Sequence, residues 1–267
     1  MIDYKYVTLE VSDVCREVGR FMKEAQAGFG EAYVEEKGLH DLVSFVDREA
    51  ETRLMERLSE LLPGSGFLAE ESGNRHGDSF RWIIDPLDGT TNFVHGLPLY
   101  SISIALQNEN ETVLGVVYEV GRDECFYAWK DGPAMLNSQI IAVSRTQVLQ
   151  KSLVATGFPY SDFSRMTPYM GVFDELMRTT RGIRRLGSAA VDLAYVACGR
   201  FEVFYEYGLN PWDVAAGAFI VERAGGQLSD FNGGQEVIFG REIIASNTLV
   251  HQQFMAVMAR YFGSESK

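Results

Sequence analysis

Cysteine is scarce in this chain, and long apolar runs are missing. The 267 residues include three cysteines, Cys15, Cys125 and Cys198, an odd number at wide spacing. This argues against a disulfide framework and a cysteine zinc cluster, and it favours a reducing compartment. No apolar run approaches the roughly 20 residues of a membrane span, and the first residues lack a signal-peptide pattern. We therefore expect a cytoplasmic protein with no membrane association.

Positive charge is also in short supply. The chain has 24 lysine and arginine residues against 37 aspartate and glutamate residues, a formal net charge of −13. Such a field repels polyphosphates, so we expect no nucleic-acid partner. A small phosphorylated substrate remains compatible, because bound metal ions can reverse the charge locally. The arginines Arg181, Arg184 and Arg185 form a basic cluster, for which a solvated or subunit-contacting face is favoured over a phosphate clamp.

Several catalytic signatures are missing as well. The four histidines lie far apart, without the spacing or the cysteine partners of a zinc site. The chain has neither the Gly-x-Ser-x-Gly motif of serine hydrolases nor the Gly-x-x-x-x-Gly-Lys-Ser/Thr loop that holds nucleotide phosphates. Zinc chemistry, a serine nucleophile and P-loop nucleotide hydrolysis are therefore not expected.

The hydrophobic pattern mixes helices and strands along the whole chain. Apolar spacings of three and four predict helices at 7–25, 44–61, 166–177, 188–198, 211–224 and 249–261. Short apolar runs predict strands at 67–69, 81–84, 101–106, 113–119, 124–129, 153–156, 201–205, 227–229 and 243–245, with a polar loop at 73–78. No linker or repeat divides the chain. We expect one mixed α/β domain over 1–267, in two packed halves at roughly 1–145 (α+β) and 146–267 (α/β).

The most informative segment is 82–93, Trp-Ile-Ile-Asp-Pro-Leu-Asp-Gly-Thr-Thr-Asn-Phe. An apolar run typical of a buried strand ends in two carboxylates, Asp85 and Asp88, at a proline turn, and Gly-Thr-Thr-Asn is typical of a helix start. Such a strand end places hard oxygen ligands beside free backbone N–H groups, where a divalent metal and a phosphate can meet. Taken alone, however, Asp-Pro-x-Asp-Gly is more often a plain turn.

Other acidic residues follow apolar segments elsewhere in the chain, namely Glu70, Glu71, Glu206 and Asp213. Individually, the Glu-Glu pair is usually solvated surface, Glu206 could be exposed, and Asp213 could stabilise the first turn of a helix. Together with Asp85 and Asp88, the acidic set suits two Mg²⁺ ions about 4 Å apart that clamp the oxygens of a displacement at phosphorus. This joint pattern favours a metal-dependent phosphate-ester hydrolase.

The motifs resemble those of the inositol monophosphatase family, magnesium-dependent and lithium-sensitive phosphatases. Segments 82–93 and 212–217 (Trp-Asp-Val-Ala-Ala-Gly) are similar to its two signature motifs, and 69–72 (Ala-Glu-Glu-Ser) is similar to its Gly-Glu-Glu-Ser. Gly-Ser-Ala-Ala at 187–190 and Tyr-Glu-Tyr-Gly at 205–208 follow in the expected order. The resemblance covers roughly 37–245. It fails at 132–138, where Gly-Pro-Ala-Met-Leu-Asn-Ser replaces the usual Gly-Ala-Phe-x-Asn-Gly.

The resemblance implies a layered αβαβα sandwich of the inositol monophosphatase and fructose-1,6-bisphosphatase type, and a homodimer. It implies two to three Mg²⁺ per subunit, held by Glu70, Asp85, the Leu87 carbonyl, Asp88 and Asp213. It assigns catalytic roles to Glu70, Thr90 and Asp47, with Glu71 behind the ligands. It implies substrate contacts from Asp88, Gly89, Thr90, Thr91, Ala189, Glu206 and Asp213.

The implied activity is hydrolysis of myo-inositol monophosphate, a small phosphorylated polyol, by direct attack of a metal-activated water, with inhibition by lithium. Relatives in the same group hydrolyse 3′-phosphoadenosine nucleotides, fructose 1,6-bisphosphate or histidinol phosphate. Segments 187–192 and 205–208 are more similar to the inositol branch, and the charge of Glu206 disfavours a second phosphate nearby. A different alternative is a regulator that keeps the fold without the activity, since some bacterial relatives are implicated in transcription complexes.

Overall fold

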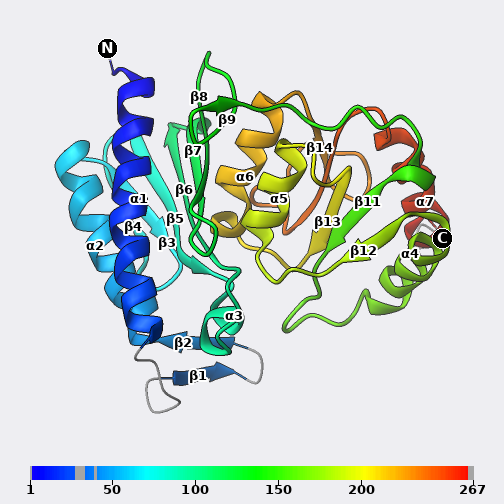
Figure 1. The fold of residues 1–267 in the computed structure, drawn as a ribbon, viewed down its shortest axis with the longest axis horizontal. Helices are drawn as coiled ribbons and strands as arrows, with labels where there is room; N and C mark the ends of the chain where they lie inside the picture. The colour runs from blue at the N-terminus through cyan, green and yellow to red at the C-terminus, as the bar shows by residue number, and fades with distance from the viewer. Residues whose placement is uncertain (1, 28–33, 39–40, 264–267) are drawn as a thin grey trace.

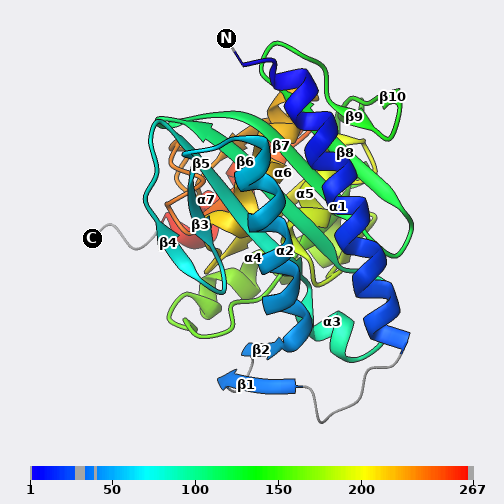
Figure 2. The ribbon, with the colours of Figure 1, turned by 90° about the vertical axis from the view of Figure 1, so that its left-hand side faces the viewer.

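The computed structural model describes residues 2–27, 34–38 and 41–263, which form alternating layers of helices and sheets (Figure 1). The outer layer on one side consists of α1 (Tyr4–Ala27) and α2 (Phe45–Leu61). Figure 2 shows these two helices lying across one face of the first sheet. A separate antiparallel hairpin, β1 (Val34–Gly38) and β2 (Asp41–Ser44), lies beside the short α3 (Thr90–Val94).

The first sheet runs in the order β10-β9-β8-β7-β6-β5-β3-β4. The central strand β5 pairs in parallel with β3 and antiparallel with β6. Helix α2 covers one face of β5 and the middle helical layer covers the other, which explains its continuous apolar run. The strands are β3 (Gly66–Ala69), β4 (Gly73–Arg75), β5 (Phe80–Asp88), β6 (Ser101–Asn108), β7 (Glu111–Glu119), β8 (Glu124–Trp129), β9 (Met135–Leu136) and β10 (Gln139–Ile140).

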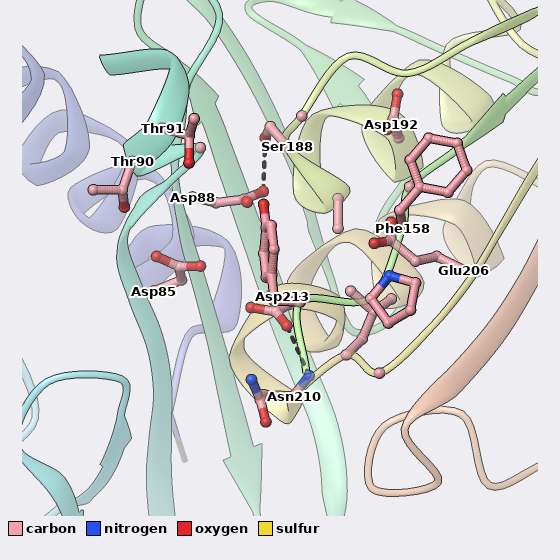
Figure 3. A pocket seen from close by; sticks show the side chains of 18 of the residues that line it. Asp85, Asp88, Thr90, Thr91, Phe158, Ser188, Asp192, Glu206, Asn210 and Asp213 are labelled. Atoms are coloured by element: carbon pink, nitrogen blue, oxygen red, sulfur yellow. Dashed lines mark hydrogen bonds between the residues drawn. The ribbon is translucent and has the colours of Figure 1, made fainter. Parts of the chain in front are cut away.

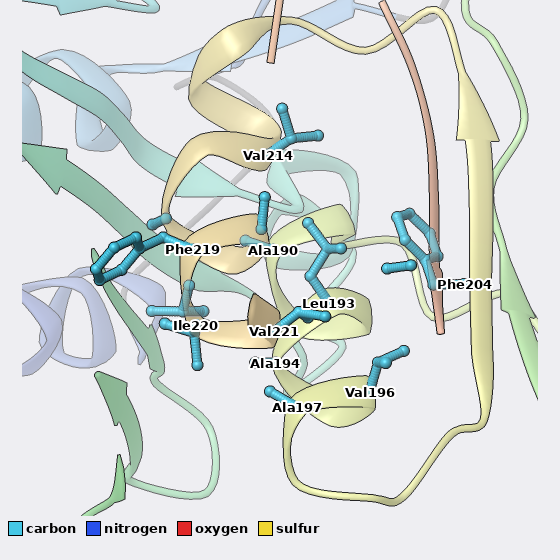
Figure 4. Packing of buried hydrophobic residues seen from close by; sticks show 14 of the residues in the cluster. Ala190, Leu193, Ala194, Val196, Ala197, Phe204, Val214, Phe219, Ile220 and Val221 are labelled. Atoms are coloured by element: carbon cyan, nitrogen blue, oxygen red, sulfur yellow. The ribbon is translucent and has the colours of Figure 1, made fainter. Parts of the chain in front are cut away.

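The middle layer consists of α5 (Ala189–Ala197) and α6 (Pro211–Arg223), which pack against each other between the two sheets (Figures 1 and 4). Their contact is built from alanines and medium-sized aliphatic residues. A Cβ at Gly217 would lie 2.6 Å from the Cβ of Leu193, and one at Gly115 of β7 would lie 2.7 Å from the carbonyl oxygen of Ala216. Glycine at these two positions therefore lets α6 approach α5 and the first sheet closely.

The second sheet runs in the order β12-β11-β13-β15-β14. Its outer face is covered by α4 (Met166–Thr179) and α7 (His251–Phe262), which enclose a separate aromatic-rich core (Figure 1). A short 3₁₀ turn, Leu149–Lys151, leads into this half. The strands are β11 (Leu153–Thr156), β12 (Gly182–Arg184), β13 (Val203–Tyr207), β14 (Gln227–Ser229) and β15 (Glu242–Ser246).

The layered αβαβα fold is confirmed, and most predicted elements occur within a few residues of their predicted bounds. The prediction of a polar loop at 73–78 was wrong in part, because Gly73–Arg75 forms an edge strand, β4, that pairs with β3. Strand β12 was not predicted, and β13 begins at Val203 instead of at 201. In the part of the chain that the structure describes, no helix is long and apolar enough to cross a membrane. The division into halves near residue 145 stays a prediction.

The first prediction concerns the contact between α5 and α6. Gly217→Ala adds a methyl group 2.6 Å from Leu193 Cβ, an atom close to the backbone of α5 that cannot move aside. We expect overpacking of about 1–3 kcal/mol to exceed the helix-propensity gain of about 1 kcal/mol, so the melting temperature falls. The matched control is Gly171→Ala in α4, where the half-buried ring of Tyr261 can shift. A Gly217→Ala protein as stable as the control would contradict this account.

The second prediction concerns pH and the docking of α7. His251 is buried between the hydroxyls of Ser246 (2.8 Å from Nδ1) and Ser229 (3.3 Å from Nε2), and burial lowers its pKa below 6.5. The unfolded chain therefore binds this proton first, so the free energy of unfolding decreases as the pH falls below 6.5. Urea unfolding at about pH 7.5 and about pH 5.5 should show a smaller loss for His251→Gln than for the wild type. The exposed-site variant His76→Gln should keep the full wild-type loss.

Candidate active site

A cavity of about 450 Å³ lies where distant parts of the chain meet (Figure 3). Its wall comes from the ends of β3, β5 and β13, the loop after β11, and the starts of α5 and α6. Every residue predicted to bind metal or substrate lines this cavity: Glu70, Asp85, Leu87, Asp88, Gly89, Thr90, Thr91, Ala189, Glu206 and Asp213. The structure thus brings the predicted set together, while the roles of its members stay predictions.

A bulge at the end of β5 places two of the carboxylates. Asp85 is opposite Ser103 of β6, and Asp88 is opposite Ser101, so three steps along β5 match two steps along β6. Residues three apart on a regular strand face opposite sides of a sheet, and the extra residue of a bulge returns them to the same side. The backbone N–H of Leu87 donates to Asp85 Oδ1 at 2.9 Å and holds the bulge in shape.

The turn after β5 depends on Gly89. Its φ of +99° lies in the left-handed region, which strongly favours glycine, and it precedes the first residue of α3. The hydroxyl of Thr90, at that first position, lies 3.0 Å from Asp47 Oδ1 and 3.0 Å from the Leu87 carbonyl oxygen. Asp47 is therefore not in the cavity wall but reaches the site through Thr90, from helix α2.

The turn after β3 is fixed by a residue that the sequence analysis did not single out. Glu51 of α2 is buried, and its two carboxylate oxygens each accept a hydrogen bond at 2.8 Å, from the N–H groups of Glu71 and Ser72. This holds Glu70 at the cavity while Glu71 remains outside its wall. Little in the sequence indicates this role of Glu51, because an acidic residue inside a helix is ordinarily solvated.

Asp88 connects the first sheet to the start of α5. One of its oxygens, Oδ2, accepts hydrogen bonds from the Ser188 hydroxyl at 2.6 Å and from the Ala190 N–H at 2.7 Å. Burial raises the pKa of Asp88 to about 6, although these hydrogen bonds lower it in part. The positive end of the α5 dipole also faces this carboxylate, so the helix start stabilises its charged form.

Asp213 holds the corresponding place at the start of α6. It is the third residue of that helix, and its Oδ2 accepts a hydrogen bond from the N–H of Asn210 at 2.7 Å, as in a capping box. Burial, and then the charge of Asp88, raises the pKa of Asp213 to about 8. Asp213 therefore both stabilises the first turn of the helix and belongs to the site: one of its oxygens caps the helix, and its side chain lines the cavity.

Burial dominates the electrostatics of this side of the cavity, and repulsion between carboxylates adds to it. Burial raises the pKa of Asp85 well above its usual range, and the charges of Glu70, Asp88 and Asp213 raise it further. Burial raises the pKa of Glu70 in the same way, with Asp213 as the next cause, and a hydrogen bond joins Glu70 to Asp85. Two carboxyl groups that share a hydrogen bond need a proton or a cation between them.

This donor set has the chemistry of a divalent cation site. Four carboxylates and a backbone carbonyl are the hard oxygen ligands that Mg²⁺ prefers, and a cation would replace their mutual repulsion with attraction. Among the described residues, no three or more His, Cys, Asp or Glu side chains are arranged to hold a metal ion as they stand. Two of the carboxylate oxygens already accept hydrogen bonds from Ser188, Ala190 and Asn210. The agreement of this site with Mg²⁺ therefore rests on the type and charge of its ligand groups.

The opposite wall of the cavity has another character. Glu206 of β13 is buried, which raises its pKa to about 8, while the Arg185 guanidinium lowers it. A Cβ on Gly157 would lie 2.1 Å from Glu206 Oε1, so a side chain at this position of the loop after β11 would require the carboxylate to shift. Arg185 Nη2 donates to the Tyr160 hydroxyl at 3.4 Å across the cavity.

Sequence reasoning overlooked part of this wall. Arg181 and Arg184 are exposed, as predicted, and Arg185 is exposed too, yet its guanidinium lines the cavity. Asp192 of α5 also lines the cavity and was not a candidate. Their positions in the sequence could have indicated this. Arg185 lies three residues before Ser188, the cap of α5, and Asp192 lies four residues after Ser188, about one helical turn.

Comparison with known proteins gives a consistent result. The model of the inositol monophosphatase family matches residues 3–265. The chain is 39% identical to inositol-1-monophosphatase of Mesorhizobium japonicum over 226 residues, 84% of this chain and 85% of the relative. It is 40% identical to Nus factor SuhB of Escherichia coli over 225 residues, 84% of each. A crystal structure of extragenic suppressor protein suhB from Bartonella henselae superimposes with a TM-score of 0.90 at 36% identity, covering 98% of this chain and 100% of the other.

The third prediction tests the crowding of like charges. Asp213→Asn removes one charge from the cavity while its amide oxygen can still accept from Asn210 N–H. Because the folded-state pKa of Asp213 is raised to about 8, its charged form destabilises the fold at neutral pH. In chelator, we expect the variant to melt a few degrees higher, on the order of 1 kcal/mol. The matched control Asp230→Asn, in a turn outside the cavity, should show no gain, and a melting temperature below wild type for Asp213→Asn would contradict the crowding.

Proposed function

Since the chain belongs to the inositol monophosphatase family, we propose that it is a Mg²⁺-dependent phosphomonoesterase that releases inorganic phosphate from myo-inositol monophosphate. The observation that carries the proposal is the convergence of Glu70, Asp85, Asp88 and Asp213 on one cavity. They come from separate parts of the chain, Asp85 is buried and the other three are partly buried, and a fold does not ordinarily crowd four carboxyl groups in this way without a function for them. The cytoplasm as its location and a homodimer as its assembly belong to the same proposal.

The metal-binding residues would be Glu70, Asp85, the Leu87 carbonyl, Asp88 and Asp213, for two to three Mg²⁺ per subunit. When bound, divalent cations lower the pKa of water and neutralise the charge that develops on the phosphoryl oxygens. Asp85 lies at the start of the bulge in β5, and Glu70 and Asp88 are both among its charged neighbours. This position suits it to be the ligand that two cations share. Glu71 would support this set from outside the cavity wall.

Thr90, Asp47 and Glu70 would position the attacking water. The Thr90 hydroxyl has a single proton to donate, and either the Asp47 carboxylate or the Leu87 carbonyl accepts it. Its lone pairs are then available to accept a hydrogen bond from a water in the cavity. Glu70, on the same wall, would receive the proton that this water loses during attack on phosphorus.

The phosphate would bind at the turn into α3, and the alcohol part would extend from there toward Glu206. The N–H groups of Gly89, Thr90 and Thr91, at the turn into α3, would bind the phosphate oxygens. Asp88, Asp213, Glu206 and the start of α5 at Ala189 would contact the hydroxyl groups of the polyol. Carboxylates suit this task, because hydroxyl protons donate to them strongly.

A second candidate function rests on the names of the relatives. Nus factor SuhB of Escherichia coli is as similar to this chain as the inositol-1-monophosphatase of Mesorhizobium japonicum. A role of the Nus-factor kind, with or without phosphatase activity, is therefore the alternative that we retain. Other substrates of the same chemistry are 3′-phosphoadenosine nucleotides and fructose 1,6-bisphosphate.

The fourth prediction tests the activity and its metal dependence. Phosphate release should be measured in parallel from inositol 1-phosphate, adenosine 3′,5′-bisphosphate and fructose 1,6-bisphosphate. We expect inositol 1-phosphate to have the highest kcat/KM, and chelation of Mg²⁺ to abolish release. Asp88→Asn should fold normally and lose at least roughly 10²-fold in kcat, because it removes charge where the reaction develops it.

Asp230→Asn, outside the cavity, serves as the control and should retain wild-type kcat. Wild-type turnover by Asp88→Asn in Mg²⁺ would overturn the assignment of the site. A wild-type protein that hydrolyses none of the three esters would instead favour the Nus-factor alternative, which copurification with the transcription machinery would then test.

A further inference from the structure

Asp192 is a buried carboxylate that the proposed reaction does not use. It lies on α5 and lines the cavity, and 1% of its surface is exposed. Among the described residues, nothing donates a hydrogen bond to its Oδ1 atom. Asp88 and Asp213, by contrast, each accept hydrogen bonds from backbone or hydroxyl donors. A buried acceptor without a partner is costly for the fold, so its retention at a cavity wall calls for a reason.

A structural role at the helix start does not account for Asp192. The capping position of α5 is taken by Ser188, whose hydroxyl accepts from the Val191 N–H at 3.3 Å. Asp192 is the fourth residue of the helix, and its own N–H donates to the Ser188 carbonyl at 3.0 Å in the ordinary helical pattern. Attraction to the helix dipole contributes a little, but a solvated acidic residue would supply that without burial.

The surroundings of Asp192 define a distinct corner of the cavity. Its electrostatic neighbours include Glu206 of β13 and the Arg185 guanidinium, and all three residues line the cavity. Figure 3 shows Asp192 and Glu206 on the side of the cavity opposite Asp85. Gly157 also lines the cavity, and a side chain there would displace the Glu206 carboxylate from its present position. We call Asp192, Glu206 and Arg185 the acidic corner.

The composition of the acidic corner selects for hydrogen-bond donors. Two carboxylates present acceptor oxygens, and the single guanidinium already has Tyr160 as one partner. A hydroxyl group entering the corner can donate to a carboxylate without bringing negative charge.

We propose that Asp192 is a specificity-determining residue that accepts a hydrogen bond from a hydroxyl of the substrate's alcohol part, in addition to any hydroxyl bound by Glu206. The proposal rests on the proposed function and deepens it. What it adds is a second acceptor beside Glu206, which would favour alcohol parts with at least two hydroxyls beyond the ester.

The test compares Asp192→Ala and Asp192→Asn with the wild type on two substrates. Inositol 1-phosphate presents hydroxyls, and phenyl phosphate has none. For Asp192→Ala, kcat/KM on inositol 1-phosphate should fall roughly 10- to 100-fold, mostly through KM, because a substrate hydroxyl would be left without its hydrogen-bond partner in a buried corner. Asp192→Asn keeps an acceptor oxygen and should lose less. Both variants should hydrolyse phenyl phosphate within about twofold of wild type.

A control variant and a binding assay separate the possible failures. Glu222→Gln alters a carboxylate on the neighbouring helix α6, outside the cavity, and should behave as wild type on both esters. Equal losses on both esters, or no loss on either, would overturn the role of Asp192. If the wild type hydrolyses neither ester, the proposed function fails, and calorimetric binding of inositol 1-phosphate then decides the inference. Wild-type binding that Asp192→Ala weakens would support it; unchanged binding, or none by the wild type, would overturn it.

Discussion

The burial of four carboxyl groups at the junction of the two sheets is the constraint around which this protein is built. Burial raises the pKa of Glu70, Asp85, Asp88 and Asp213, which we call the acidic cluster, and the charges of neighbouring carboxylates raise the pKa of Glu70, Asp85 and Asp213 further. The fold compensates part of this with dipoles. The N-terminus of α5 donates to Asp88 and that of α6 includes Asp213, so the two helix starts direct partial positive charge at the acidic cluster. The rest of the cost must be offset by packing elsewhere.

The middle layer supplies that packing and also sets the positions of the carboxylates. Alanines along α5 and α6, with Gly217 at their closest approach, let the two helices pack tightly between both sheets. Tight packing of this kind tolerates little displacement, so the helix starts are held at fixed places. The Ser103 hydroxyl, which donates to the Trp212 carbonyl at 3.1 Å, ties the start of α6 directly to β6. Core packing and site geometry therefore depend on the same contacts.

Much of this could be predicted from the sequence, for identifiable physical reasons. The apolar run at 82–84 could be assigned to a buried strand, and the acidic residues after apolar segments could be grouped because strand and helix ends converge. Strands β4 (Gly-Asn-Arg) and β12 (Gly-Ile-Arg) were missed because neither contains an apolar run. The bulge between Asp85 and Asp88 was missed because it depends on pairing with β6. Glu51 and Asp192 were missed because their importance arises only from residues distant in sequence.

The two acidic groups of the cavity come from different elements of the fold. The acidic cluster comes from the end of β3, from β5 and from α6, whereas the acidic corner comes from β13, α5 and the segment before α5. Arg185 lies in that segment, outside any helix or strand and largely exposed, and the 157–161 loop faces it across the cavity. Loop positions tolerate substitution better than packed strand ends do. Under the proposed function, Asp88 and Asp213 serve both the chemistry at phosphorus and the recognition of the alcohol, whereas the acidic corner serves recognition alone, so the corner can change in a related sequence while the chemistry is kept.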